Sequence, residues 1–291
     1  QIVDTKKTQT DSPNVSSEQP PRIRIATFNV QAFDQIKSRK PAVLDVLARI
    51  GREFDVLAIQ EIQSRSDDVL PRLVTLMNKT GQEYDFAVGP RVGPDGAQEQ
   101  YGFVFNRRTV QIDRAELYTV DDRDDLFMYE PFVAWFRTVN AAPQHAFTFS
   151  LINLRIDPST AEQEIEYLDQ LLYAVQHDGR QEDDIILAGD LQASAAYLKE
   201  AGLSAEIGFA VTDVPTNVVA TEAWDNLVFY KTSTAEFTGN AGIFDFLRIY
   251  NLTIDQALEV SDHLPVWAEF RIDEGVADGR FASVPAETSR R

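Results

Sequence analysis

Core strands that end in acidic or amide side chains are the feature that most constrains the fold of this chain. The clearest example runs over residues 184–188 and is followed at once by Gly189 and Asp190. A second apolar stretch, residues 55–60, ends directly in Glu61. Functional groups concentrate where rigid strands give way to loops, so these strand ends are expected to meet in one cleft. Five residues hold such positions: Asn29, Glu61, Asp190, Asp225 and Asp262.

Amphipathic helical segments alternate with the strands. Residues 40–54 place four aliphatic side chains on one helical face, with Pro41 in the first turn. Residues 67–79 repeat that pattern, and residues 159–177 give the clearest helix, with Ser159 or Thr160 as its cap. A short helix is also predicted over residues 194–201.

Further strands are predicted at residues 22–30, 111–120, 225–230 and 266–272, and residues 131–139 and 146–155 form a hairpin. Hairpins mixed with helix-linked strands predict one α/β domain over residues 22–272, with two packed sheets and helices outside them. Residues 1–21 are predicted to be a flexible polar tether and residues 273–291 a polar tail.

The composition limits the partners of this chain. Its 291 residues are 44% hydrophobic, which suffices for one large core. A formal net charge of -19 repels polyanions at long range and does not favour nucleic acid as a ligand. A cation can supply the missing positive charge locally, so a metal-bridged phosphate substrate stays compatible with the acidity. The chain has no cysteine, which excludes disulfides, thiolate catalysis and zinc–thiolate sites.

The location of the protein is an expectation from the first residues. Residues 1–21 are rich in Thr, Ser, Gln and Pro, as is a leader that follows a removed secretion or lipoprotein signal. We therefore expect a secreted or periplasmic protein, with the cytoplasm as the alternative. No apolar run approaches the length of a membrane span. The sequence does not indicate an oligomeric state.

Converging carboxylates at the strand ends predict a metal site. They either raise one another's pKa or bind a hard cation, and Mg²⁺ favours one or two carboxylates with phosphate oxygens. Ser261, Asp262 and His263 stand just before the apolar stretch 266–270. One side chain of that group can hold the metal while its neighbour faces a substrate. A nearby Asp or His can then exchange protons with water or with a leaving oxygen.

Seven stretches span nearly the whole predicted domain: residues 27–31 (TFNVQ), 59–62 (IQEI), 99–101 (EQY), 152–155 (INLR), 187–192 (LAGDLQ), 224–226 (WDN) and 261–265 (SDHLP). In these stretches, and in their order, the chain resembles the endonuclease/exonuclease/phosphatase superfamily, of deoxyribonuclease I-like fold. The resemblance implies a four-layer α/β/β/α sandwich and Mg²⁺- or Mn²⁺-dependent cleavage of phosphate esters.

The resemblance also implies a role for each site residue. Glu61 would be the main metal ligand, aided by Asn29 and Asp262. Asp190 would orient or deprotonate the attacking water. His263 would act on the scissile phosphate, steered by Asp225 or by Glu99.

Three positions depart from the family pattern. The family's Asn-Leu-His reads Asn153-Leu154-Arg155 here, and arginine clamps phosphate but does not titrate in the range of histidine. Gln192 replaces an asparagine and adds a methylene, and a shift of about 1 Å can cost on the order of a hundredfold in rate. Tyr129 replaces an arginine and removes a phosphate contact. The other two histidines, His145 and His177, are expected at the surface.

Two functions remain open on the sequence. The first is a metal-dependent phosphoesterase with a modified cleft, containing Asp190, His263, Asp225, Gln192 and Arg155. The second is a catalytically degenerate member that binds or scaffolds a partner without turnover. The phosphate-ester substrate is not specified, and the loops at residues 89–98 and 202–222 are expected to shape that choice.

Overall fold

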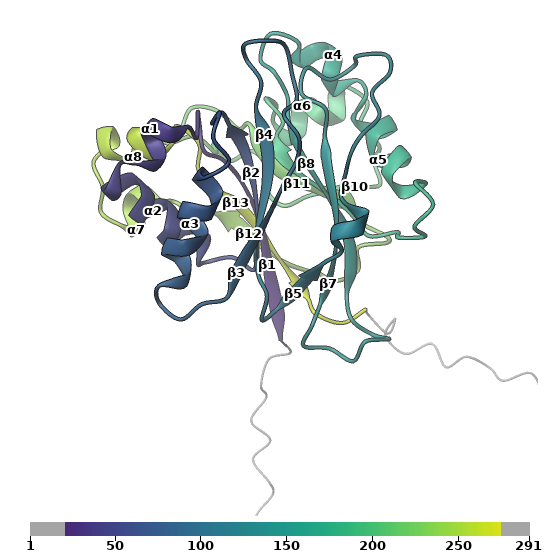
Figure 1. Cartoon of the computed structure of the whole chain (residues 1–291). Helices are drawn as coiled ribbons and strands as arrows, with labels where there is room; N and C mark the ends of the chain where they lie inside the picture. The colour runs from purple at the N-terminus through teal and green to yellow at the C-terminus, as the bar shows by residue number, and fades with distance from the viewer. Residues whose placement is uncertain (1–20, 275–291) are drawn as a thin grey trace, which may run out of the picture.

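Two β-sheets lie face to face at the centre of the structure, a computed structural model that describes residues 21–274 (Figure 1). The first sheet has the strand order β12-β13-β1-β2-β4-β3. Its strands are β1 (Arg22–Asn29), β2 (Val56–Ile62), β3 (Tyr84–Val88), β4 (Gln100–Asn106), β12 (Phe237–Ile243) and β13 (Val266–Arg271).

The second sheet has the order β10-β11-β9-β8-β7-β5, with β6 paired to β7. Its strands are β5 (Val110–Ile112), β6 (Tyr118–Thr119), β7 (Phe132–Thr138), β8 (Thr148–Arg155), β9 (Ile185–Asp190), β10 (Ile207–Phe209) and β11 (Asp225–Tyr230). A 3₁₀ turn, Arg114–Glu116, separates β5 from β6.

Aromatic side chains fill the space between the sheets. Phe103 of the first sheet stacks on Phe132 of the second, with ring centroids 5.4 Å apart. Phe136 and Phe149 continue the stack within the second sheet at 5.4 Å. Alternate residues of each strand point to one face, so every second position joins this core and the others face the helices.

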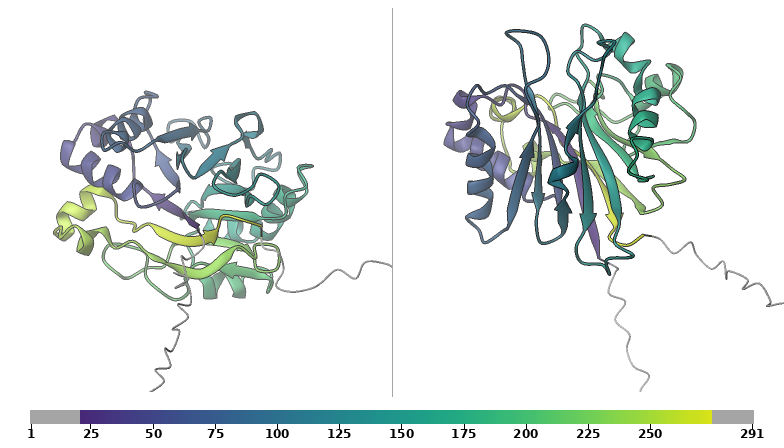
Figure 2. Two further views of the ribbon diagram at one scale, coloured as in Figure 1. Left: turned by 90° about the horizontal axis from the view of Figure 1, so that it is seen from below. Right: turned by 45° about the vertical axis from the view of Figure 1, so that its right-hand side comes forward.

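Helices cover the outer faces of both sheets and complete the four layers (Figure 2). The first sheet is covered by α1 (Gln35–Ser38), α2 (Pro41–Gly51), α3 (Val69–Asn78), α7 (Phe246–Ile249) and α8 (Ile254–Val260). The second is covered by α4 (Ala161–Ile165), α5 (Leu168–Gln176) and α6 (Ala195–Glu200). The α/β/β/α sandwich expected from the sequence is confirmed. None of the helices among residues 21–274 is long and apolar enough to cross a membrane.

Strand direction brings the polar strand ends to one end of the sandwich. β1 and β2 are parallel, with Asn29 opposite Gln60. β8 and β9 are also parallel, with Arg155 opposite Asp190. β11 runs antiparallel to β9, so its first residue, Asp225, also pairs with Asp190.

Two predicted elements are broken in the structure. The helix expected over residues 159–177 is split into α4 and α5, because the Tyr167 N–H bonds to the Glu164 carbonyl, only three residues back, in a tight turn. The strand expected over residues 111–120 is interrupted by the 3₁₀ turn, where Asp113 accepts a hydrogen bond from the Ala115 N–H. The expected hairpin is present as β7 and β8.

The predicted terminal segments fall mostly outside the described residues, namely 1–20 of the tether and 275–291 of the tail. Two residues assigned to the tail pack on the fold. Asp273 bridges to Ala146, and Glu274 accepts a hydrogen bond from the Thr148 N–H at 2.9 Å. The ordered structure therefore continues past residue 272.

Candidate active site

Asn29 links the two sheets at the polar end of the sandwich. Its buried Nδ2 donates to Oε1 of Glu61 at 3.0 Å and to Oδ2 of Asp190 at 2.9 Å. Its Oδ1 accepts from the backbone N–H of Gln31 at 2.8 Å, which fixes the orientation of the amide. One side chain thus holds carboxylates from β2 and β9 at a set separation.

Glu61 stands in a strained backbone conformation. Its φ is 57°, and Gln31 and Ala32 in the facing loop have φ values of 48° and 52°. Non-glycine residues in this left-handed region each cost about 1–3 kcal/mol and persist where the surroundings hold them. Here the Ala32 N–H donates to Oε2 of Glu61 at 2.8 Å, so the strained loop aims a donor at the carboxylate.

Asp190 follows a glycine that the packing of β8 and β9 requires. A Cβ at Gly189 would collide with the carbonyl oxygen of Leu154. Asp190 is 1% exposed and accepts two hydrogen bonds from Nε2 of Gln192, at 2.9 and 3.1 Å. Gln192 itself has a φ of 52°. The longer glutamine therefore still brings its amide to the carboxylate, by way of a left-handed turn.

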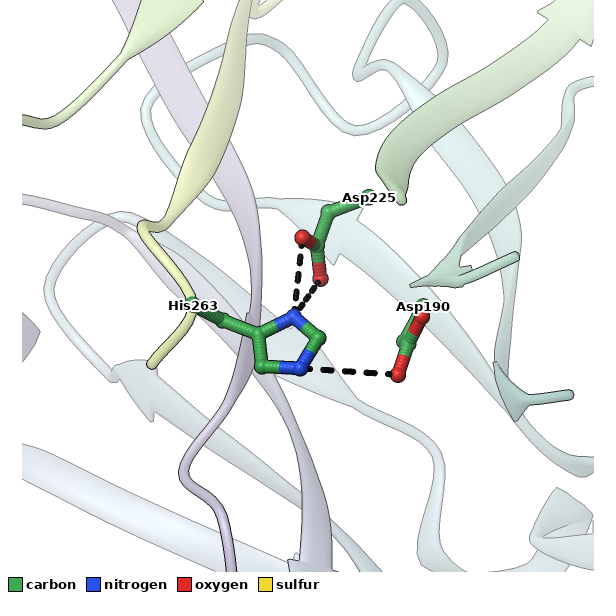
Figure 3. A group of neighbouring side chains, drawn as sticks. All are labelled: Asp190, Asp225 and His263. Atoms are coloured by element: carbon green, nitrogen blue, oxygen red, sulfur yellow. Dashed lines mark hydrogen bonds and ion pairs between the residues drawn. The ribbon is translucent and has the colours of Figure 1, made fainter. Parts of the chain in front are cut away.

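His263 and Asp225 form a buried pair (Figure 3). Nδ1 of His263 lies 3.0 Å from both carboxylate oxygens of Asp225. Oδ2 of Asp225 also accepts from the Thr216 hydroxyl at 2.7 Å. The Trp224 ring packs on the imidazole with centroids 5.0 Å apart. Of the two partners expected for His263, the structure selects Asp225.

The free edge of His263 faces Asp190. Nε2 lies 3.8 Å from Oδ2 of Asp190 (Figure 3). It also lies 3.7 Å from Oδ1 of Asp262. Both distances exceed a hydrogen bond, so these groups face a shared space. Burial lowers the pKa of His263. The carboxylate of Asp225, with smaller effects from Asp190 and Asp262, raises this pKa by a larger amount, so that the net pKa is above its usual range. Burial also raises the pKa of Asp190, against the opposing effect of the His263 charge.

Arg155 occupies the space between three carboxylates. Its Nε lies 3.1 Å from Oε1 of Glu61, and its Nη1 lies 3.7 Å from both Glu99 and Asp157. The guanidinium also sits over the Tyr129 ring, 5.1 Å from the centroid. The two departures at residues 129 and 155 therefore contact each other and form one altered subsite beside Glu61.

Glu99 is fully buried and forms an ion pair with Arg155, not with His263. Its carboxylate lies 3.7 Å from Nη1 of Arg155. Burial raises the pKa of Glu99 to about 8, although the Arg155 charge opposes the shift. The expectation that Glu99 steers the imidazole is wrong, because its partner within the site is the guanidinium.

Two residues that sequence reasoning missed support the site. Lys37 of α1 donates through Nζ to the carbonyls of Val30, Gln31 and Val260, and so secures the strained loop beside Glu61. Thr216 fixes Asp225. A lone lysine in a short helix and a threonine in a long loop carry no local pattern that would have singled them out.

The oxygen donors near Glu61 suit a hard cation. Oδ1 of Asp262 is buried and has no hydrogen-bond partner in the described part of the chain. Carboxylate and amide oxygens are ligands that Mg²⁺ and Mn²⁺ accept. Asp190, Asp225 and His263 also bring ligand atoms within 4.8 Å of one another. Since Nδ1 of His263 is already engaged by Asp225, that trio is better suited to proton transfer than to metal binding.

Comparison with known proteins decides the family. The profile of the endonuclease/exonuclease/phosphatase family matches residues 26–195. The chain belongs to this family. A member, deoxyribonuclease gamma of Homo sapiens, is 29% identical over 272 residues, covering 88% of this chain and 87% of that protein. Deoxyribonuclease-1-like 1 of Sus scrofa is 31% identical over 259 residues, covering 84% and 80%.

Solved structures of the endonuclease/exonuclease/phosphatase family show the same fold at lower identity. A family protein from Bacteroides thetaiotaomicron superposes with a TM-score of 0.56 at 16% identity, covering 86% of this chain and 98% of that one. D. rerio TDP2 complexed with a single-strand DNA product gives 0.57 at 15% identity, with the same coverage. By its family, the chain is a phosphoesterase, a hydrolase of phosphate ester bonds.

Proposed function

We propose that this phosphoesterase hydrolyses phosphodiester bonds of DNA with the help of a divalent cation. The observation that carries the proposal is the facing pair of His263 and Asp190, with Nε2 and Oδ2 3.8 Å apart over a shared space. An oxygen of water or of phosphate that lies beside both atoms would reach both groups. The substrate class is inferred from the relatives, since those with 27–31% identity over most of this chain are named deoxyribonucleases.

Asp190 is the proposed base. It takes a proton from the attacking water as the water oxygen bonds to phosphorus. The bond from phosphorus to the leaving oxygen breaks, and that oxygen keeps the electron pair and takes a proton from solvent water. Asn29 and Gln192 donate to Asp190 and hold its orientation. Burial raises the pKa of Asp190, which brings a carboxylate closer to the range where a base works best near neutral pH.

His263 is the proposed electrostatic partner of that base. Asp225 keeps the imidazole protonated and fixes its ring, so Nε2 donates a charged hydrogen bond. Because Nε2 and Asp190 are so close, both groups reach the same side of a bound phosphate. His263 therefore donates to a non-bridging oxygen next to the attacking water and stabilises the charge that develops there.

Glu61, Asp262 and Asn29 are the proposed holders of Mg²⁺ or Mn²⁺. Such a cation neutralises phosphate charge and polarises a phosphoryl oxygen. A bound cation also makes the net charge of -19 compatible with a DNA substrate, because positive charge is needed only at the bound phosphate. Arg155 adds a fixed positive charge beside Glu61 and is the proposed clamp for a second phosphate oxygen.

A second candidate function rests on the same arginine. Oε1 of Glu61 already accepts a hydrogen bond from Nδ2 of Asn29 and lies 3.1 Å from Nε of Arg155. If the guanidinium keeps this place, it supplies the positive charge in place of the metal, and the cleft binds a phosphate ester without turnover. This is the binding or scaffold alternative, in which Arg155 prevents metal binding at Glu61.

Calorimetric titration with Mn²⁺ and Mg²⁺ separates the two functions. We expect the parent chain to bind one ion that Glu61→Gln loses, and Asp124→Asn, a charge-matched change in an exposed loop, to keep it. Supercoiled DNA is then incubated with each protein. Equal titrations of the parent and Glu61→Gln exclude the proposed metal site and, together with no cleavage, favour the binding protein. A site that Glu61→Gln loses, together with cleavage by the parent, supports the metal-dependent hydrolase.

A further inference from the structure

Three neighbouring strands of the second sheet hold the candidate active-site residues in one row. Asp225 of β11 and Arg155 of β8 both pair with Asp190 of β9, the strand between them. Directly paired residues place their side chains on the same face of a sheet, and neighbouring strands lie about 4.8 Å apart. Asp190 is therefore flanked by the pair of His263 and Asp225 on one side and by Arg155 on the other.

The row gives the attacking and the leaving oxygen of a displacement at phosphorus different neighbours. In the proposed reaction the attacking water lies beside His263 and Asp190, because Nε2 and Oδ2 face the same space. Attacking and leaving oxygens stand roughly in line, on opposite sides of phosphorus. The leaving oxygen then points away from His263 and along the row, towards Arg155.

Arg155 is partly exposed and keeps donors for that oxygen. Its side chain is 13% exposed, and Nη1 lies 3.7 Å from the carboxylates of both Glu99 and Asp157. Both distances exceed a hydrogen bond, so these carboxylates do not use up the N–H donors of Nη1. A guanidinium stays protonated in proteins, so it attracts an oxyanion without giving it a proton.

The side chains around the guanidinium do not supply that proton either. Glu99 is completely buried and does not reach a substrate. The Tyr129 hydroxyl donates to a backbone carbonyl. Glu61 and Asp157 accept hydrogen bonds at their carboxylates. Within residues 21–274, the side chains that contact Arg155 thus include no acid placed to protonate the leaving oxygen.

We propose that Arg155 is a catalytic residue that stabilises the leaving oxygen as an anion, so that the enzyme prefers phosphodiesters with a phenol-type leaving group. The inference rests on the proposed hydrolysis and narrows its substrates. As the bond from phosphorus to the leaving oxygen breaks, that oxygen keeps the electron pair, and the guanidinium donates charged hydrogen bonds to it. The oxygen takes a proton from solvent water after it has left. Sugar hydroxyls are far less acidic than phenols, so cleavage between two nucleotides is the slower reaction.

A series of aryl esters of thymidine 5′-phosphate tests this role, since only the leaving phenol changes along it. For the full chain with Mn²⁺, kcat/KM should fall by about 10²-fold or more from the 4-nitrophenyl to the unsubstituted phenyl ester. A positioned acid contributes about 10²–10⁴-fold and would level such a series. Arg155→His supplies a group that can protonate the oxygen, so its kcat/KM should fall by only about tenfold. Arg155→Gln should be slower than the parent with every ester, and Asp124→Asn should match the parent.

The parent series decides the question even where Arg155→His does not fold. If the parent cleaves the phenyl and 4-nitrophenyl esters within about tenfold of each other, and Asp190→Asn cleaves neither, a proton reaches the leaving oxygen. That result overturns the role of Arg155 and leaves the proposed hydrolysis standing. Equal rates of the parent and Arg155→Gln on every ester would also overturn it. No Asp190-dependent cleavage of any ester would instead reject the proposed hydrolysis, and this inference with it.

Discussion

Nε2 of His263 and Oδ2 of Asp190 lie 3.8 Å apart, although they come from different sheets and stand 73 positions apart in the chain. Hydrogen bonds fix the orientation of each side chain. His263 is bonded to Asp225, and Asp190 accepts from Asn29 and Gln192. The gap between them is too wide for a hydrogen bond, and an oxygen that lies beside both atoms can contact each of them at hydrogen-bond distance.

Replacing Asp190 by Asn removes the proposed base with little change of shape. We expect kcat to fall by about 10²–10⁴-fold, the range for loss of a positioned base. Steady-state cleavage of DNA or of an aryl phosphodiester measures it, with Asp124→Asn as the surface control. A kcat within a factor of two of the parent would remove Asp190 from the mechanism.

Replacing Asp225 by Asn should slow the reaction and change its pH dependence. Asp225 is the largest cause that raises the pKa of His263, so the variant imidazole loses its proton at lower pH. Activity that needs the protonated ring declines as pH rises through that pKa, so the alkaline limb of the pH–rate profile should move to lower pH. Thr216→Val, which removes only the hydroxyl that fixes Asp225, should give a smaller shift. An alkaline limb unchanged in Asp225→Asn would argue against the role of His263.

Replacing Arg155 distinguishes the phosphoesterase from the binding protein, because the guanidinium clamps phosphate in the first and takes the place of the metal in the second. If the guanidinium clamps phosphate, Arg155→Gln should raise KM and lower kcat/KM by about tenfold or more, as loss of a charged hydrogen bond of 1.5–3 kcal/mol implies. Arg155→His restores the residue type of the nuclease pattern and should keep more activity than Arg155→Gln. The binding-protein reading gives a different result, in which both variants bind Mn²⁺ more tightly than the parent because Glu61 is released.

Replacing Gln192 should trade stability against activity. Its φ of 52° favours glycine, so Gln192→Gly relieves about 1 kcal/mol or more of backbone strain while removing two hydrogen bonds to Asp190. We expect a Tm equal to or above that of the parent and a kcat lower by about tenfold. Asparagine tolerates the same φ and keeps an amide, so the kcat of Gln192→Asn should lie between that of the parent and that of Gln192→Gly. A drop in Tm without a drop in kcat would reverse this assignment.

Glu99 should make the protein less stable as pH rises. Its folded pKa of about 8 lies above the unfolded value of 4.5, so the folded state binds the extra proton between those pH values. The free energy of unfolding therefore falls across that window, by on the order of 5 kcal/mol for this group. Urea unfolding at several pH values compares the parent with Glu99→Gln. The difference between them should grow from pH 5 to pH 8, and parallel curves would show that Glu99 does not titrate there.

The sequence by itself determined the chemistry of the strand ends. Asn29, Glu61 and Asp190 each follow a buried apolar stretch, and the carboxyl ends of parallel strands meet at one edge. Gly189 before Asp190 has a local reason as well, since β8 leaves no room for a side chain there. Periodicity also located α2, α3 and the β7–β8 hairpin, because these elements bury one face along a continuous segment.

Only the tertiary structure decided the partners across the sheets. It assigned Asp225 to His263 and Glu99 to Arg155, although the sequence left both acids as candidates for the imidazole. Strand order and register place Arg155 beside Glu61, 94 positions away. Such contacts depend on how two sheets align, and no local spacing encodes that alignment. The burial that shifts the pKa values of Glu99 and Asp190 arises from the same packing.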